Sequence, residues 1–247
     1  MQFQPMRCQT APPEAAPPEA APPEAVAPEG AASEVVTSRA GNLRAVQFQV
    51  WDVPTLRTRL DEVVAVYRAA FLDVYERDPD RAAAERRVHA RTHLERPGVR
   101  AVAALAPATP VPPAELVGFA YGHPGRDGQW WHDVVTRSVP PTVARTWFGD
   151  CFEVVELHVL PDWQGRGIGR TLLRMLLSQA RTETAALSAL AGPDTRARRL
   201  YDSEQFHPLH DRFRFPGSPT EYAILVKRLR PASRHDARDG APVAALS

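Results

Sequence analysis

The chain has 247 residues, of which 30 are basic and 29 acidic, giving a formal net charge of +1. This balance excludes the strong positive field that nucleic-acid-binding proteins use, so we expect no nucleic-acid partner. No apolar run approaches the ~18 residues of a membrane span, and the N-terminus lacks an apolar signal segment, so we expect no membrane association and a cytoplasmic location.

The N-terminal segment repeats a short proline-rich unit, APPEA, which begins at residues 11, 16 and 21. Such a stretch buries too little apolar surface to offset the entropy of ordering its backbone. We predict that residues 1–43 form an extended, acidic, disordered tail, either a dispensable leader or a tether that docks a partner. Residues 231–247 are expected to form a second disordered tail, and one domain is expected between them, over 44–230.

The first half of this domain shows strand and helix patterns in turn. Apolar alternation predicts a strand over 46–52, and Pro54 favours a helix start just after it. Steps of three and four place a set of apolar residues on one face of that helix: Leu56, Leu60, Val63, Tyr67, Phe71 and Val74. A more polar helix is expected over 79–94, and an antiparallel hairpin over 99–106 and 115–122.

Residues 123–150 are too many for a plain hairpin loop and are rich in tryptophan. Trp130, Trp131 and Trp147 either line a pocket, form a lid over it, or pack this insertion, and we favour packing. The elements that follow are expected to be strand, helix, strand, helix and strand, over 153–160, 167–181, 185–190, 194–203 and 222–226. This order predicts an α/β fold in which a mixed sheet has helices on its faces.

Three glycines fall within five positions in the stretch PDWQGRGIGRTLL, residues 161–173, between an expected strand and an expected helix. A helix start that follows such a turn favours an anion, because its first N–H groups are unpaired and the helix dipole is positive there. A dinucleotide fingerprint would need glycine at Arg170, and a P-loop would need a lysine that this stretch lacks. The other interpretation is a turn that serves packing alone.

The stretch ELHVLPDWQGRGIG resembles the acyl-CoA signature Q/R-x-x-G-x-G/A of the GNAT superfamily of N-acetyltransferases. A second segment resembles the family pattern N-x-x-A-x-x-L-Y-x-x-x-G-F through Ala197, Leu200, Tyr201 and Phe206. Asp194 and Gln205 depart from that pattern, at the ends of the local helix. The resemblance covers about residues 44–230, extends to uncharacterised actinobacterial members, and implies the GNAT fold with a mostly antiparallel central sheet.

The resemblance also implies how acetyl-CoA, the cosubstrate, is bound. Loop amides would hold the pyrophosphate, with added contacts from Arg166 and Arg170, and the backbone over 157–159 would pair with the pantetheine arm and stabilise the oxyanion. The expected cofactor-binding residues are Leu157, His158, Val159, Gln164, Gly165, Arg166, Gly167, Ile168, Gly169, Arg170 and Thr171.

The chemistry needs a proton acceptor, because an alkyl amine with a pKa of ~10.4 is mostly protonated at pH 7. Glu153, Glu156 and His158 are candidates, either directly or through a water, although each also has a purely structural interpretation. Regular alternation places Glu153 on the face opposite Glu156 unless a β-bulge changes the parity, and the resemblance favours Glu153. Tyr201 matches the tyrosine that protonates the departing thiolate, its alternative role being packing.

We therefore predict a bacterial, cytoplasmic, acetyl-CoA-dependent N-acetyltransferase. A primary amine, a small molecule rather than a protein, is expected to attack the thioester directly. The alternative is a non-catalytic acyl-CoA-binding sensor or scaffold of the same fold. A homodimer is compatible with the sequence but is not indicated by any pattern in it.

Other reactive side chains give weaker signals. His89 and His93 have a spacing that metals can use, but without a third ligand we interpret them as part of a solvated face and expect no metal site. Ser188 lacks the glycines of a nucleophile elbow, so we expect no covalent intermediate. Cys8 and Cys151 do not suggest a disulfide framework.

Overall fold

The computed structural model describes residues 46–70, 79–106, 115–192 and 195–229. Within these ranges the strands form one sheet in the order β1-β2-β3-β4-β5-β7-β6. The strands are β1 (Gln47–Trp51), β2 (Arg100–Ala106), β3 (Glu115–Pro124), β4 (Cys151–Val159), β5 (Thr184–Leu190), β6 (His207–Arg214) and β7 (Glu221–Arg228). Neighbouring strands are antiparallel except β4 and β5, so the predicted mixed, mostly antiparallel sheet is confirmed.

The described helices are α1 (Val53–Thr58), α2 (Leu60–Ala70), α3 (Pro79–Leu94), α4 (Trp130–Arg137), α5 (Pro141–Phe148), α6 (Ile168–Ser178) and α7 (Arg196–Ser203). The single helix predicted after Pro54 is two helices, since α1 ends at its C-cap, Arg59. Asp52 caps α1 by accepting a 2.8 Å hydrogen bond from the Thr55 amide. Phe71 and Val74, the two tails, and the expected boundaries at 44 and 230 lie outside the described residues.

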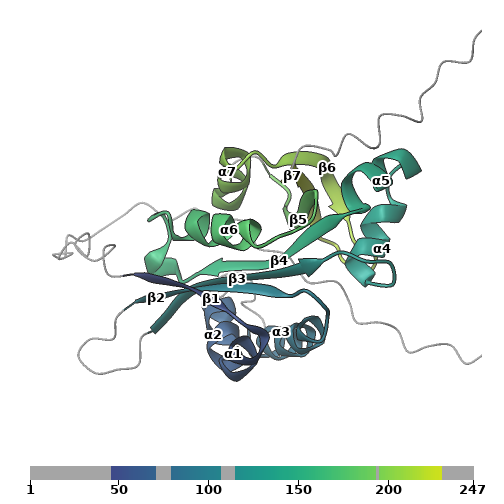
Figure 1. Ribbon diagram of the computed structural model, residues 1–247. Coiled ribbons are helices and arrows are strands. Elements are labelled where there is room, and N and C mark those ends of the chain that lie inside the picture. Colours follow the sequence, from purple (N-terminus) through teal and green to yellow (C-terminus); the bar gives the residue numbers. More distant parts are fainter. Residues whose placement is uncertain (1–45, 71–78, 107–114, 193–194, 230–247) are drawn as a thin grey trace, which may run out of the picture.

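Helices cover both faces of the sheet (Figure 1). The apolar face of α6 buries Ile168, Leu172, Leu173 and Leu176 against one face of β2, β3 and β4. On the other face, α1, α2 and α3 pack against the same strands, and the predicted stripe contributes its buried residues Leu56, Leu60, Val63 and Tyr67. Each such side chain contributes about 1.5–3 kcal/mol by leaving water, so the sheet and α6 form a rigid base for the turn that precedes α6.

The helices α4 and α5 and the strand β6 were not predicted. α4 and α5 fill the tryptophan-rich segment and pack beside β5 and β7 (Figure 1). The expectation that the tryptophans pack is confirmed, because Trp131 is buried and the partly buried Trp130 and Trp147 pack against the same core. The indole N–H of Trp131 donates to the Ser188 hydroxyl at 3.3 Å. β6 is an edge strand whose side chains are mostly exposed, so it lacks the apolar pattern that predicts a strand.

The connection from α7 to β6 explains why one departure from the family pattern matters. The amide of Gln205 donates to the Asp202 carbonyl and the amide of Phe206 to the Tyr201 carbonyl, both at 3.0 Å, which is the Schellman arrangement of a helix end. Gln205 has a φ of 64°, the left-handed conformation that favours glycine. A glutamine therefore occupies a position where the backbone suits the glycine of the family pattern.

We expect Gln205→Gly to stabilise the protein by up to about 1 kcal/mol, because the left-handed conformation costs an L-residue ~1–2 kcal/mol and glycine loses ~0.5–1 kcal/mol more backbone entropy. Arg199→Gly, inside α7, is the matched control and should destabilise by about 1 kcal/mol. Urea unfolding of both variants measures the difference. If Gln205→Gly lost as much stability as the control, the explanation by backbone strain at Gln205 would be wrong.

Candidate functional site

The parallel pairing of β4 and β5 is short. Only Cys151, Phe152 and Glu153 of β4 pair with β5, opposite Thr184 to Ala186. Beyond Glu153, none of the described strands pairs with β4 on that side, although β3 continues to pair along its other edge as far as Val159. The main-chain groups of residues 154–159 that point toward β5 are therefore left for other partners.

The glycine turn begins just past this open edge. Gly165 and Gly167 have φ values of 72° and 82°, and a side chain built at either position would meet no atom within 4 Å. The backbone conformation therefore favours glycine at both positions, and the space above them is open. Gly169 differs, because a Cβ there would lie at an ordinary 3.5 Å from the Leu200 side chain.

The amides of this turn are unpaired. Thr171 donates the first helical bond, to the Gly167 carbonyl at 3.0 Å, and no described group accepts from the N–H groups of residues 165–170. Gly167 caps the helix with no side-chain hydrogen bond. Six consecutive N–H groups without a described partner, at the positive end of a helix, have the geometry that suits an anion with several oxygens. Ile168 contributes its amide alone, since its side chain is buried in the core.

The polar side chains around the turn are partly committed to the protein. Gln164 donates to the Val159 carbonyl at 3.0 Å and accepts from Arg196 at 3.3 Å, so it ties the turn to both β4 and α7. The guanidinium of Arg166 lies over the Trp163 ring, 5.1 Å from its centroid. The Thr171 hydroxyl donates to the Gly167 carbonyl at 3.3 Å.

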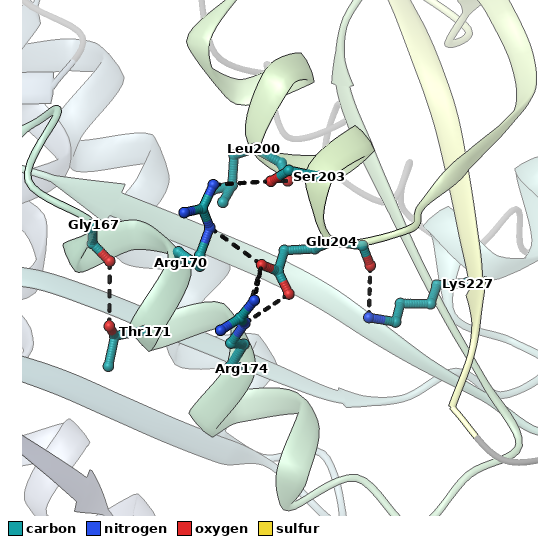
Figure 2. Close-up of polar contacts among 8 residues, drawn as sticks. All are labelled: Gly167, Arg170, Thr171, Arg174, Leu200, Ser203, Glu204 and Lys227. Carbon is teal, nitrogen blue, oxygen red and sulfur yellow. Dashed lines mark hydrogen bonds and ion pairs between the residues drawn. The ribbon is translucent and has the colours of Figure 1, made fainter.

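Glu204, which the sequence analysis did not identify, holds α6 against the end of α7 (Figure 2). Its buried carboxylate pairs with Arg170 at 3.2 Å and with Arg174 at 2.9 Å, and Lys227 of β7 donates to its main-chain carbonyl at 2.6 Å. Arg170 also donates to the Ser203 hydroxyl at 3.1 Å. The predicted phosphate contact of Arg170 would therefore have to share this guanidinium with Glu204.

A β-bulge brings both candidate glutamates to the same face of the sheet. Tyr121 lies opposite Glu156 and Gly122 opposite Val154, so Val155 is the extra residue on β4. Both carboxyl groups consequently lie on the side covered by α2 and α3, and both act on the pKa of Tyr121. The opposite faces predicted for Glu153 and Glu156 from regular alternation are therefore wrong, and the β-bulge considered as an exception is present.

Glu156 is locked in place as a carboxylate. Its Oε1 accepts from Arg86 of α3 at 2.7 Å, both side chains being 6 % exposed, and its Oε2 lies 2.5 Å from His158 Nε2. Burial alone would raise the pKa of Glu156, but Arg86 and then His158 outweigh it and hold the pKa well below the ordinary range. Such a carboxylate is a weak base and a good orienting group for His158.

Glu153 has the opposite environment. It is 4 % exposed, and its Oε2 has no hydrogen-bond partner among the described residues. Burial raises the pKa of Glu153 to about 7, although Arg96 acts in the other direction. A carboxyl group that titrates near neutrality suits a general base.

Tyr201 lies on the other face of the sheet, in the core that β4 shares with α6 and α7. Its ring packs edge-on against Phe206, and no described group hydrogen-bonds its hydroxyl. Burial, and then the charge of Glu156, raise the pKa of Tyr201, so the hydroxyl keeps its proton at pH 7.

The expectation of a solvated face for His89 and His93 is wrong. Both are half-buried, and His93 Nδ1 lies 3.2 Å from the Tyr121 hydroxyl. Burial and then Arg96 lower the pKa of His93 to about 3, and the same two causes lower that of His123 to about 4, so both rings are neutral at pH 7.

Arg86 could have been found from the sequence, because it shares the helical spacing of Ala83, Ala90 and Leu94 on the buried face of α3.

The sequence matches the family model described as "Acetyltransferase (GNAT) family" over residues 60–206. The chain is also 37% identical, over 160 residues, to the GCN5-like protein acetyltransferase Rv2170 of Mycobacterium tuberculosis, a match that covers 56% of this chain and 78% of that protein. The chain therefore belongs to the GNAT family of acetyltransferases, as the signature predicts, and its relative is actinobacterial.

Two solved structures are similar at lower identity. One is yncA from Salmonella typhimurium, solved with its cofactor acetyl-CoA, with 19% identity, a TM-score of 0.49, and coverage of 81% of this chain and 99% of that one. The other is ribosomal-protein-alanine N-acetyltransferase from Brucella melitensis, with 19% identity, a TM-score of 0.49, and coverage of 74% of this chain and 99% of that one.

In the described part of this chain, no helix combines the length and the apolar character of a membrane span.

We expect Arg86→Met to destabilise the protein by about 3–5 kcal/mol at pH 7, because it leaves Glu156 as a buried charge without its cation. The double variant with Glu156→Gln should recover most of this loss. The low pKa of Glu156 stabilises the wild type above ~4.3, the ordinary glutamate pKa, and this contribution disappears as the pH falls below that value. The deficit of Arg86→Met should therefore shrink in acid, as measured by urea unfolding across pH; a deficit independent of pH would refute the ion-pair explanation.

Proposed function

We propose that the chain is an acetyl-CoA-dependent N-acetyltransferase in which a primary amine attacks the thioester directly. The observation that carries this proposal is the run of six amides over residues 165–170 that have no partner in the described part of the chain and that follow the open edge of β4. An acyl-CoA has a pyrophosphate that such amides can bind and an amide-containing arm that can pair with an exposed strand edge. The family match supports transfer of an acetyl group.

In this proposal the cosubstrate lies across the turn and along β4. The amide N–H groups of residues 165–170 donate to the pyrophosphate oxygens, and Arg166 can leave its stacking contact with Trp163 to add positive charge. The main chain of Leu157, His158 and Val159 pairs with the pantetheine arm and supplies an N–H for the oxyanion. Gln164 and Thr171 hold the turn through their contacts to Val159 and Gly167.

Glu153 is the proposed general base. Its near-neutral pKa and its unpaired oxygen suit it to accept the proton of the amine through a water, whereas Glu156 is held by Arg86 and orients His158. The amine nitrogen then bonds to the thioester carbon, the carbon–sulfur bond breaks, and the electron pair leaves on sulfur. Tyr201, protonated at pH 7, gives its proton to the thiolate.

We propose that the acceptor of the acetyl group is a small-molecule amine, as expected from the sequence. A protein acceptor is the second candidate, and one observation favours it: the 37% identical relative is named a protein acetyltransferase. The cytoplasmic location, bacterial origin and homodimer considered in the sequence analysis stay predictions.

The first test compares acetyl-CoA with acetylpantetheine, which has the same thioester and no pyrophosphate. We expect amine-dependent release of free thiol from acetyl-CoA, and a fall in kcat/KM of at least about 100-fold with acetylpantetheine, because two lost charge-assisted hydrogen bonds are worth ~3 kcal/mol or more. A thiol assay measures both. Equal rates with the two thioesters would refute the pyrophosphate site.

The same assay, run with small amines and with lysine-containing and N-terminal peptides, separates the candidate acceptors. Turnover confined to peptides would replace the small-molecule proposal by a protein acceptor. Tight binding of acetyl-CoA by calorimetry with no thiol release across the panel would support the non-catalytic sensor instead.

The second test follows Glu153 by pH. Because the base must be ionised, kcat/KM of the wild type should rise through a pKa of about 7, and Glu153→Gln should lose about 10²–10⁴-fold in rate together with this step. The exposed Glu115→Gln is the control and should keep the wild-type profile. The raised pKa also makes wild-type stability fall as pH rises from the ordinary ~4.3 to about 7, so Glu153→Gln should lose less stability over that range. An unchanged rate profile in Glu153→Gln would exclude it as the base.

A further inference from the structure

The turn between β3 and α4 gathers three potential metal ligands that the proposed reaction does not use. Asp127, His132 and Asp133 each offer one ligand atom, and these atoms all lie within 4.8 Å of one another. Asp127 is fully exposed, Asp133 is half-buried, and His132 is 5 % exposed. The cluster lies near the start of β4, since the Gly125 amide donates to the Cys151 carbonyl at 2.8 Å, whereas the glycine turn follows the other end of β4.

His132 points an unpaired nitrogen into this cluster. Its Nε2 lies 3.2 Å from the Phe148 carbonyl of α5, which can only accept, so Nε2 carries the proton and donates. In the neutral ring Nδ1 then carries a lone pair, is closed to solvent, and has no hydrogen-bond partner among the described residues. It faces Asp127 Oδ1 and Asp133 Oδ1, each at 3.8 Å, and neither carboxylate can donate to it. Three electron-rich atoms therefore converge on one point.

The surrounding contacts resemble the second layer of a metal site. A metal-binding histidine usually donates its other N–H to a carbonyl or carboxylate, as His132 does to Phe148. Asp133 is fixed by Arg137 on Oδ2 at 2.8 Å and by the Gly128 amide on Oδ1 at 3.0 Å, and Oδ1 keeps a second lone pair. Asp127, being exposed, can move the short distance needed for metal bonds of ~2.0–2.2 Å.

We propose that Asp127, His132 and Asp133 bind one divalent transition-metal ion, for which Zn²⁺ suits a donor set of one imidazole and two carboxylates. The two carboxylates neutralise the ion, and a water completes the coordination. The ion ties the turn to α4 and, through the hydrogen bond of His132, to α5. This site is structural and goes beyond the proposed acetyl transfer.

The test uses the untagged full chain, stripped with a chelator, dialysed and titrated with Zn²⁺ alone. Calorimetry should show one ion bound per chain, with an upward shift of the melting temperature. Asp127→Asn should weaken binding by at least about 100-fold, since loss of outer contacts alone costs ~10–100-fold, and should abolish the shift. Because the Asp127 side chain is fully exposed, this variant should fold like the wild type.

Glu115→Gln, an exposed carboxylate outside the cluster, is the matched control and should bind Zn²⁺ like the wild type. The proposal is overturned if the wild type binds no Zn²⁺. It is also overturned if Asp127→Asn binds Zn²⁺ with unchanged affinity, because the ion would then be held at another place, such as a surface histidine.

Discussion

The separation of β4 from β5 after Glu153 is the constraint on which the functional end of the molecule depends. A strand edge without a neighbour leaves main-chain groups that need partners, and a few residues after this edge comes a turn whose amides also have no partner among the described residues. The packing of α6 on β2, β3 and β4 fixes the turn relative to that edge. Gln164 links the two, because its side chain donates to the Val159 carbonyl at 3.0 Å.

Two glutamates three residues apart acquire opposite properties from their neighbours. Glu156 meets Arg86 and His158 and stays ionised, whereas Glu153 has no cation in contact and is easily protonated. The bulge at Val155 places both on the same face, so the difference comes from their partners on α3 and β4 rather than from the side of the sheet. Burial makes each contact count, because no water screens it.

Local patterns predicted most of the fold. The apolar runs of β2, β3 and β4, the apolar stripe of α6 and the glycines at 165 and 167 report the conformation of their own residues, and the strands, the helix and the turn that they predict are present. The mostly exposed edge strand β6 and the helices α4 and α5 were missed, since their stability comes from neighbours rather than from their own pattern. The same applies to Glu204, whose partners come from α6 and β7.

The sequence by itself determined the family, the order of the principal strands and helices, and the location of the glycine turn before α6, because these depend on residues close together in the chain. The tertiary structure decided why the pKa values of Glu153 and Glu156 move in opposite directions, why the half-buried His93 is neutral, and which carboxylate oxygens the His132 Nδ1 faces. The reason is physical: a pKa or a ligand set depends on burial and on charges brought together by folding, and in the case of Arg86 and Glu156 these lie 70 residues apart in the chain.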